Sequence, residues 1–282
     1  MSIENIAVIG AGTMGNGIAQ VCAVAGYQVT LIDVSEAALE RGLATLRKNL
    51  ERQVGKQTLQ AEQAEAALTR IATSTDYAQL KGAQLVIEAA TENLALKVKI
   101  LQQVAASVAD DCVIATNTSS LSITQLGASV SQPERFVGVH FFNPVPMMAL
   151  VEIIRGLQTS DATYASAMAL TERVGKTAIS AGNRPGFVVN RILVPMINEA
   201  IMVLQEGLAS AEDIDTGMRL GCNQPIGPLA LADLIGLDTL LAIIESFHDG
   251  FNDSKYRPAA LLKEMVAAGY LGRKSGRGFF TY

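Results

Sequence analysis

A strand-like apolar run, Ile6–Ile9, leads directly into a glycine-rich turn, and Asp33 closes the next apolar run. A strand, a glycine turn, a helix and a second strand that ends in an acid form the context that dinucleotide-binding domains require. Gly10 permits the tight turn, Gly12 lets the backbone approach a pyrophosphate at the positive end of the following helix, and Gly15 allows that helix to pack closely on the strand. We therefore predict dinucleotide binding; the alternative is a tight strand-to-helix turn that holds no ligand.

The acid at the end of the second strand bears on which dinucleotide is bound. Asp33 lies roughly 20 residues after the first glycine, where a carboxylate can accept hydrogen bonds from ribose hydroxyls. A carboxylate there repels a 2′-phosphate, and Val34 and Ser35 supply no cation to counter it. The pattern favours NAD over NADP. The glycines alone do not exclude FAD, which uses a similar fingerprint; the rest of the chain argues against it.

Length and composition restrict the remaining classes of function. The 282 residues suffice for one large or two moderate domains, and 49% hydrophobic residues supply a sizeable core. A net charge of −5, with 5% aromatics and no tryptophan, gives no reason to expect nucleic-acid binding. No uninterrupted apolar run reaches about 18 residues, so no membrane span is expected. The first strand begins within a few residues of Met1, which leaves no room for a signal or transit peptide.

The three cysteines, Cys22, Cys112 and Cys222, are widely spaced and form no paired motif. We interpret them as reduced thiols of a cytoplasmic protein, not as disulfides or a zinc site. No metal centre is predicted.

The first part of the chain alternates strand and helix patterns, beginning with a helix over Met14–Ala25. This alternation predicts an α/β fold with a doubly wound, mainly parallel sheet. A polar, helix-favouring stretch at about 36–70 is predicted to be an inserted helical hairpin with a break near Gly55. The predicted strands are Ile6–Ile9, Val29–Ile32, Leu85–Glu88, Val113–Thr116, Phe136–His140, Val151–Ile154 and Lys176–Ser180.

The character of the sequence changes at a turn-rich segment near 183–186. Beyond it, apolar residues recur with helical spacing from Val189 to Leu204, and Ser210 resembles the cap of a further helix. We predict a dinucleotide-binding domain over 1–183 and a helical domain over 184–282. A small helical domain this apolar often buries one face against a twin, so we expect a homodimer.

Histidine is scarce, with His140 and His248 as the only two. His140 ends an apolar strand, where ligands of open α/β sheets bind, whereas His248 is expected near a polar helix end. If the chain folds back about Pro146, position 140 faces position 152, and Glu152 is an unusual acid inside an apolar run. An imidazole–carboxylate pair would satisfy both groups and prepare the imidazole for proton transfer. The alternatives are a hydrogen-bonded core histidine and an edge-strand acid that faces water.

Three further polar residues stand at positions where ligands bind. Asn117 and Ser119 follow the strand Val113–Thr116 and could hydrogen-bond a nicotinamide or a substrate oxygen, or they could cap a helix that starts near Leu121. Asn190 lies in the first turns of the long C-terminal helix, where it could instead satisfy backbone groups.

The inserted hairpin carries a basic face. Lys48, Arg52 and Lys56 follow one another at intervals of four residues, with Arg47 beside them. In an acidic protein this face favours a polyanionic ligand such as a CoA thioester. A solvated helix face without a ligand is the alternative.

Taken together, the motifs resemble those of the short-chain L-3-hydroxyacyl-CoA dehydrogenases, the bacterial 3-hydroxybutyryl-CoA dehydrogenases in particular. The resemblance covers essentially the whole chain, in order. The motifs that carry it are Gly10–Ala19, Asn117–Ser120, His140–Pro144, Leu150–Glu152, Pro185–Arg191, Gly227–Leu229 with Asp233, and Gly272–Phe279.

The resemblance implies a Rossmann-like domain followed by a helical dimerisation domain, and oxidation of 3-hydroxyacyl-CoA with NAD. His140 would be the general acid and base, Glu152 would orient it, and Ser119 and Asn190 would hold the substrate oxygen. The expected substrate contacts are Asn49, Lys56, Ser119 and Asn190, with Asn49 standing where the family often has serine. The expected NAD contacts are Gly10, Gly12, Thr13, Met14, Gly15, Asp33, Glu92, Lys97, Asn117, Ser119, Asn143 and Lys274.

Two other functions compete with this interpretation. A related NAD-dependent dehydrogenase of a free β-hydroxy acid would share most of the pattern, although it would not need the basic face. A non-catalytic NAD-binding protein is disfavoured because all four expected catalytic residues are present.

Overall fold

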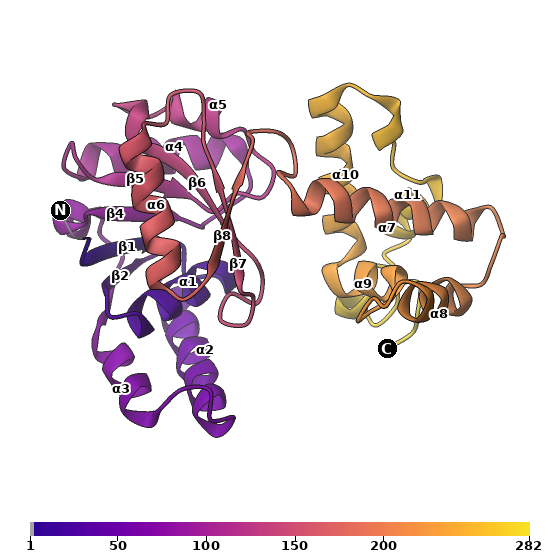
Figure 1. Ribbon diagram of the computed structural model, residues 1–282, viewed down its shortest axis with the longest axis horizontal. Coiled ribbons are helices and arrows are strands. Elements are labelled where there is room, and N and C mark those ends of the chain that lie inside the picture. Colours follow the sequence, from indigo (N-terminus) through magenta and orange to yellow (C-terminus); the bar gives the residue numbers. More distant parts are fainter. Residues whose placement is uncertain (1–2) are drawn as a thin grey trace. The chain divides into compact units, whose positions relative to one another are not determined.

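The computed structural model describes residues 3–282, which form two compact units divided between Asn183 and Arg184 (Figure 1). The first unit is an α/β domain and the second is helical, as the change in sequence pattern indicates. Among the described residues, no helix combines the length and apolar character that a membrane span needs.

An eight-stranded sheet forms the centre of the first unit, in the order β3-β2-β1-β4-β5-β6-β7-β8. All neighbouring strands pair in parallel except β6 and β7, which pair antiparallel, so the predicted parallel-majority sheet is confirmed. The strands are β1 (Asn5–Ile9), β2 (Gln28–Ile32), β3 (Ile71–Ser74), β4 (Leu85–Glu88), β5 (Val113–Thr116), β6 (Phe136–Phe141), β7 (Leu150–Ile154) and β8 (Thr177–Ala181).

Helices cover both faces of this sheet because its strands are apolar on both sides. In β6, Val137 and Val139 enter the core beneath one face, whereas Gly138 lies against Ile123, the first residue of a short helix, on the other. The first face carries α1 (Thr13–Val24), α2 (Glu36–Gly55), α3 (Ala61–Thr69) and α6 (Asp161–Arg173). The second carries α4 (Leu94–Ser107) and α5 (Ile123–Gly127).

The segment for which a helical hairpin is predicted contains α2 and α3, and α2 ends at Gly55. Ser35 caps α2 by accepting a hydrogen bond from the Ala38 N–H, and Gln60 and Gln63 form a capping box that starts α3. The strand β3, which follows directly, was not predicted. It is an edge strand that pairs only with β2, and its four residues lack the buried apolar run that marks the inner strands.

The sheet order brings several loops to one edge. Strands β2, β1, β4, β5 and β6 are parallel neighbours, so their carboxyl ends lie side by side. The glycine turn, Asp33, and the segments 89–93, 117–122 and 142–149 all follow these ends. This is the edge at which open α/β sheets bind ligands.

The second unit has a core of its own, which includes Ile197, Ile201, Leu240 and Phe247. Ser210 caps its second helix, as the sequence indicates. Its helices are α7 (Val189–Gln205), α8 (Ala211–Gly221), α9 (Pro228–Ile235), α10 (Leu237–Phe251) and α11 (Ala260–Ala267). The 3₁₀ segments are η1 (Tyr77–Gly82), η2 (Pro133–Arg135), η3 (Ser254–Tyr256) and η4 (Arg273–Ser275), of which the first two belong to the first unit.

Candidate active site

The glycine turn has the geometry that a dinucleotide pyrophosphate needs. Gly10 adopts a φ of +100°, which L side chains rarely adopt, and a Cβ on Gly15 would lie 1.7 Å from the Gly10 carbonyl oxygen. A Cβ on Gly12 would meet no atom within 4 Å, so this glycine leaves open space in front of the first turn of α1. The backbone of the chain therefore fits a phosphate group at this helix N-terminus.

Asp33 faces the same turn from the end of β2. Its Oδ2 accepts a hydrogen bond from the Ala11 N–H at 2.8 Å, and its Oδ1 accepts one from the Ser35 N–H at 3.0 Å. These two bonds fix the carboxylate beside the glycine turn, at the place predicted for a ribose contact.

A cleft of about 400 Å³ opens over this turn. Asp33, Asn143 and Asn49, all predicted to contact a ligand, line it together. The α2 wall of the cleft also contains Arg41 and Thr45, which the sequence analysis did not single out. Their signal was present, because Arg41, Thr45 and Asn49 follow one another at intervals of four residues and so share one face of α2.

His140 and Glu152 form the pair that the sequence predicts. They are directly opposite in the antiparallel register of β6 and β7, and His140 Nδ1 lies 2.7 Å from Glu152 Oε2. Both side chains are at least nine-tenths buried, and both point away from the face that packs on α1 and α6. The pair therefore lies on the α5 side of the sheet, with the Phe142 ring 4.5 Å from the imidazole.

The turn that joins β6 and β7 is held by hydrogen bonds from one lysine. Lys176 donates hydrogen bonds to the carbonyl oxygens of Val145 and Met148, at 2.7 and 2.6 Å. Burial lowers the pKa of the Lys176 ammonium below its usual range. This anchor fixes the segment that holds Asn143 at the mouth of the cleft.

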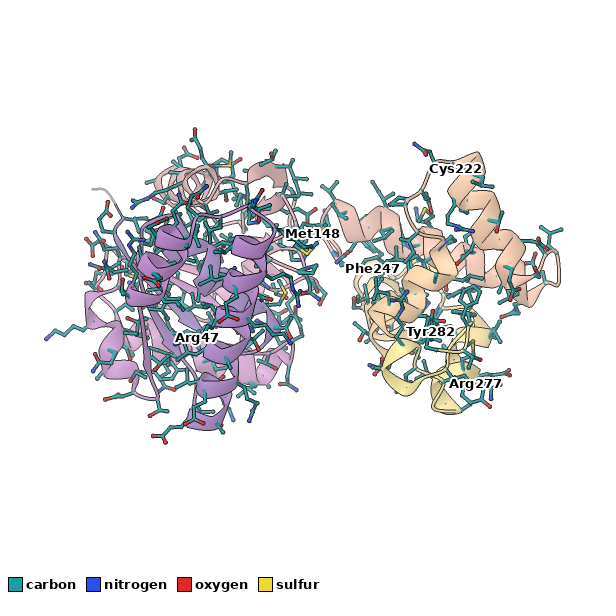
Figure 2. The ribbon with its side chains drawn as sticks, turned by 90° about the horizontal axis from the view of Figure 1, so that it is seen from below. Arg47, Met148, Cys222, Phe247, Arg277 and Tyr282 are labelled. Atoms are coloured by element: carbon teal, nitrogen blue, oxygen red, sulfur yellow. The ribbon has the colours of Figure 1, made fainter. Side chains whose placement is uncertain are left out.

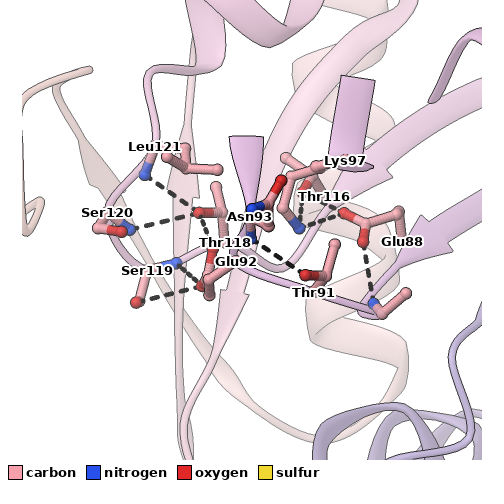
Figure 3. Close-up of polar contacts among 11 residues, drawn as sticks. Glu88, Thr91, Glu92, Asn93, Lys97, Thr116, Thr118, Ser119, Ser120 and Leu121 are labelled. Atoms are coloured by element: carbon pink, nitrogen blue, oxygen red, sulfur yellow. Dashed lines mark hydrogen bonds and ion pairs between the residues drawn. The ribbon is translucent and has the colours of Figure 1, made fainter. Parts of the chain in front are cut away.

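The loop after β5 is ordered by polar contacts and not by a helix cap at its start. Asn117 Oδ1 accepts a hydrogen bond from the Phe141 N–H at 2.9 Å, which ties this loop to the strand of His140. Glu92 accepts hydrogen bonds from the Ser119 N–H and from the Thr118 hydroxyl (Figure 3). The possible cap near Leu121 was wrong, because α5 begins at Ile123 and Ser122 is its cap.

Lys97 is almost fully buried on α4, where its ammonium donates hydrogen bonds to Glu88 and Thr116 (Figure 3). The NAD contact expected for it stays a prediction.

Asn190 and Lys274 belong to the second unit. Asn190 is half-buried in the first turn of α7, and Lys274 pairs with the Asp238 carboxylate at 2.5 Å.

The predicted basic face exists on α2. Arg47, Lys48, Arg52 and Lys56 are all exposed, and Figure 2 shows Arg47 at the surface of the helix. Among residues 3–282, no cluster of three histidine, cysteine or acidic side chains is arranged to hold a metal ion.

Comparison with known proteins then decides the family. The profile of the 3-hydroxyacyl-CoA dehydrogenase NAD binding domain matches residues 5–184, and that of the 3-hydroxyacyl-CoA dehydrogenase C-terminal domain matches residues 186–282. The chain belongs to the 3-hydroxyacyl-CoA dehydrogenase family. It is therefore an NAD-dependent oxidoreductase, and the predicted cofactor and reaction type are confirmed.

Individual relatives agree with this assignment. The 3-hydroxybutyryl-CoA dehydrogenase of Bradyrhizobium diazoefficiens is 49% identical over 99% of this chain and 96% of its own length. The mitochondrial hydroxyacyl-coenzyme A dehydrogenase of Rattus norvegicus is 40% identical over 99% of this chain and 91% of its own length. The crystal structure of (S)-3-hydroxybutyryl-CoA dehydrogenase from Ralstonia eutropha matches with a TM-score of 0.97 and 60% identity, covering 100% of this chain and 99% of that one.

Proposed function

We propose that the enzyme interconverts (S)-3-hydroxybutyryl-CoA and acetoacetyl-CoA with NAD(H). The observation that carries this proposal is the contact of 2.7 Å between His140 and Glu152, on strands whose connecting turn borders the cofactor cleft. An imidazole held by a carboxylate at this edge is suited to exchange a proton with a substrate hydroxyl.

His140 performs the proton transfer in this mechanism. Because Glu152 engages Nδ1, we assign the transfer to Nε2, which takes the hydroxyl proton during oxidation and returns it to the forming alkoxide during reduction. Glu152 fixes the tautomer and compensates the positive charge of the imidazolium. The nicotinamide supplies or accepts the hydride when it is bound.

The remaining predicted residues bind and orient the two ligands. Ser119 and Asn190 hold the substrate oxygen, and Asn49 and Lys56 contact the CoA moiety. The NAD contacts are assigned to the glycine turn with Thr13 and Met14, and to Asp33, Glu92, Lys97, Asn117, Ser119, Asn143 and Lys274. The cleft position of Asp33, Asn49 and Asn143 and the Ser119–Glu92 contact support these assignments.

A CoA thioester is favoured over a free β-hydroxy acid by the exposed cations of α2. Arg52 and Lys56 stand one turn apart at the end of α2, beside the turn that leads to α3, where phosphate groups can reach their exposed side chains. A free acid carries a single carboxylate and has no use for a separate basic face.

The decisive experiment follows NADH absorbance with acetoacetyl-CoA, with longer 3-ketoacyl-CoAs and with free acetoacetate. We expect rapid oxidation of NADH with acetoacetyl-CoA and at least about 100-fold lower kcat/KM with the free acid. Equal or faster turnover of the free acid would reject the CoA substrate in favour of the second function. No NADH oxidation with any of these compounds would reject the proposed function altogether.

We also propose that the enzyme is a homodimer through its second unit and that it works in the cytoplasm. Ile192, Leu220 and Leu234 are large apolar side chains more than half exposed on this unit, and Ile192 borders an apolar hollow of about 470 Å³. Light scattering should give twice the chain mass of 29.8 kDa, and Ile192→Glu should reduce the measured mass to that of one chain. A monomeric wild-type enzyme would contradict the dimer.

The proposed cytoplasmic location is supported by the three cysteines, which form no disulfide and therefore suit a reducing compartment.

A further inference from the structure

A buried carboxylate lies beneath the cofactor cleft, and the mechanism above does not use it. Glu88 is the last residue of β4 and is 0% exposed, and Lys97 beside it is 1% exposed. Glu88 Oε2 accepts hydrogen bonds from the Lys97 ammonium and from the Thr116 hydroxyl, the latter at 2.8 Å. Its Oε1 accepts one from the Ala90 N–H at 2.9 Å (Figure 3).

Burying an ion pair in a protein core costs desolvation free energy. Each charge must leave water, and well-packed apolar residues of similar volume often stabilise a protein as much or more. The stability of the sheet therefore does not explain why an acid stands at the end of β4. Its second oxygen, which holds the Ala90 N–H, points to a different role.

Ala90 packs directly against the glycine turn. A Cβ added to Gly10 would lie 2.7 Å from the Ala90 Cα, and the Ala89 N–H donates to the Ile9 carbonyl at 2.8 Å. The backbone at Gly10 and the backbone at Ala90 leave no room for a side chain between them. The position of Ala90 therefore sets how far the glycine turn can move, and Ala90 itself lines the cofactor cleft.

The same short segment also reaches the loop after β5. Two residues beyond Ala90, Glu92 accepts hydrogen bonds from the Ser119 N–H at 2.9 Å and from the Thr118 hydroxyl at 2.7 Å. The Glu88 carbonyl accepts a hydrogen bond from the Asn117 N–H at 2.8 Å. The backbone and side chain of Glu88 thus connect both loops that face the ligands.

We propose that Glu88 is a positioning residue for cofactor binding. Its carboxylate holds the Ala90 N–H, Ala90 holds the glycine turn at the height that fits a pyrophosphate, and Lys97 with Thr116 supplies the partners that let the carboxylate remain buried. The inference requires NAD binding alone, so it does not depend on the identity of the acyl substrate.

Two double variants separate positioning from stability. In E88Q/K97M the amide oxygen can still accept from the Ala90 N–H, whereas in E88L/K97M nothing can. Both variants lack Lys97, so any direct contact of Lys97 with NAD is lost equally in both. Neither leaves an unpaired buried charge, so we expect both to fold, which their melting temperatures check.

The readout is the Kd for NADH, measured by fluorescence titration without a second substrate. We expect the E88L/K97M Kd to exceed that of E88Q/K97M by about tenfold, because the Ala90 N–H loses the carboxylate or amide oxygen that holds it in place. Between these two variants, the KM for NADH should differ by the same factor, while their kcat values at saturating NADH should differ by less than about threefold. Equal Kd values in two folded variants would overturn the proposal.

Thr116→Val provides a second test if E88L/K97M does not fold. The substitution is nearly isosteric and removes the hydroxyl that donates to Glu88 Oε2 and accepts from the Lys97 ammonium. With the carboxylate less firmly held, we expect the Kd for NADH to rise about two- to fivefold at an unchanged kcat. A folded T116V variant with the wild-type Kd would also overturn the proposal.

Discussion

His140 Nδ1 and Glu152 Oε2 lie 2.7 Å apart across β6 and β7, at positions directly opposite in the antiparallel register. The contact is a consequence of strand pairing, because the two residues stand at equal distances from the centre of the turn that joins the strands. A shift of the register by one residue would move Glu152 to the other face of the sheet. The pair is therefore as rigid as the sheet.

A variant that lacks the His140 imidazole should lose proton transfer and still bind NADH. His140→Gln should lower kcat by about 10²- to 10⁴-fold, the usual contribution of general acid–base catalysis. The Kd for NADH should stay within about twofold, because the glycine turn and Asp33 belong to other strands. Stopped-flow turnover and NADH titration measure the two quantities, and near-normal turnover would refute the assignment of His140.

The glycines of the turn should separate folding from ligand binding. A Cβ on Gly15 would lie 1.7 Å from the Gly10 carbonyl oxygen, so Gly15→Ala should lower both the melting temperature and the affinity for NADH. A Cβ on Gly12 would meet no protein atom within 4 Å, so Gly12→Ala should keep the melting temperature. Its Kd for NADH should nevertheless rise by at least about tenfold, since the methyl group enters the space assigned to the pyrophosphate. Unaltered NADH binding in Gly12→Ala would place the pyrophosphate elsewhere.

The sequence predicted these features wherever local pattern and strand register determine position. Glu152 stood out as an acid in an apolar run, and symmetry about Pro146 was enough to place it opposite His140. The strand β3 was missed because it is a short edge strand whose pairing depends on β2 and not on its own residues. Glu88 was missed for a related reason: its partners Lys97 and Thr116 are 9 and 28 residues away, on a helix and a neighbouring strand.

The exposed lysine at the end of α2 should affect only substrates that carry the CoA phosphates. Lys56→Glu should raise the KM for acetoacetyl-CoA by about three- to tenfold, and more at low salt, because an exposed charge pair is weak and screened. The KM for acetoacetyl-pantetheine, which lacks the nucleotide, should not change. Lys81→Glu is the matched control, since Lys81 is an exposed lysine on the 3₁₀ segment Tyr77–Gly82. An equal rise of both KM values in Lys56→Glu would contradict a phosphate contact.

The three cysteines should differ sharply in reactivity. Burial raises the pKa of the Cys22 and Cys112 thiols to about 12, whereas Cys222 is exposed at the end of α8 (Figure 2). Because the thiolate is the reactive form, the two buried thiols stay protonated and unreactive at pH 8. At pH 8 a thiol reagent should therefore modify one cysteine per folded chain and three after denaturation. Cys222→Ser should abolish the reaction of the folded enzyme, and rapid labelling of a second thiol would contradict the described burial.

Cofactor preference should depend on Asp33 together with Arg41, which line the same cleft. The Asp33 carboxylate repels a 2′-phosphate, so Asp33→Ser should remove that repulsion and expose the phosphate to the Arg41 guanidinium. We expect the ratio of kcat/KM for NADPH to that for NADH to rise by at least about tenfold, mainly through a lower KM for NADPH. The double variant Asp33→Ser/Arg41→Ala should lose most of this gain, because it differs from Asp33→Ser only in lacking the guanidinium that attracts the 2′-phosphate. If the double variant uses NADPH as well as the single one, Arg41 does not contact the phosphate, and Asp33 acts by repulsion alone.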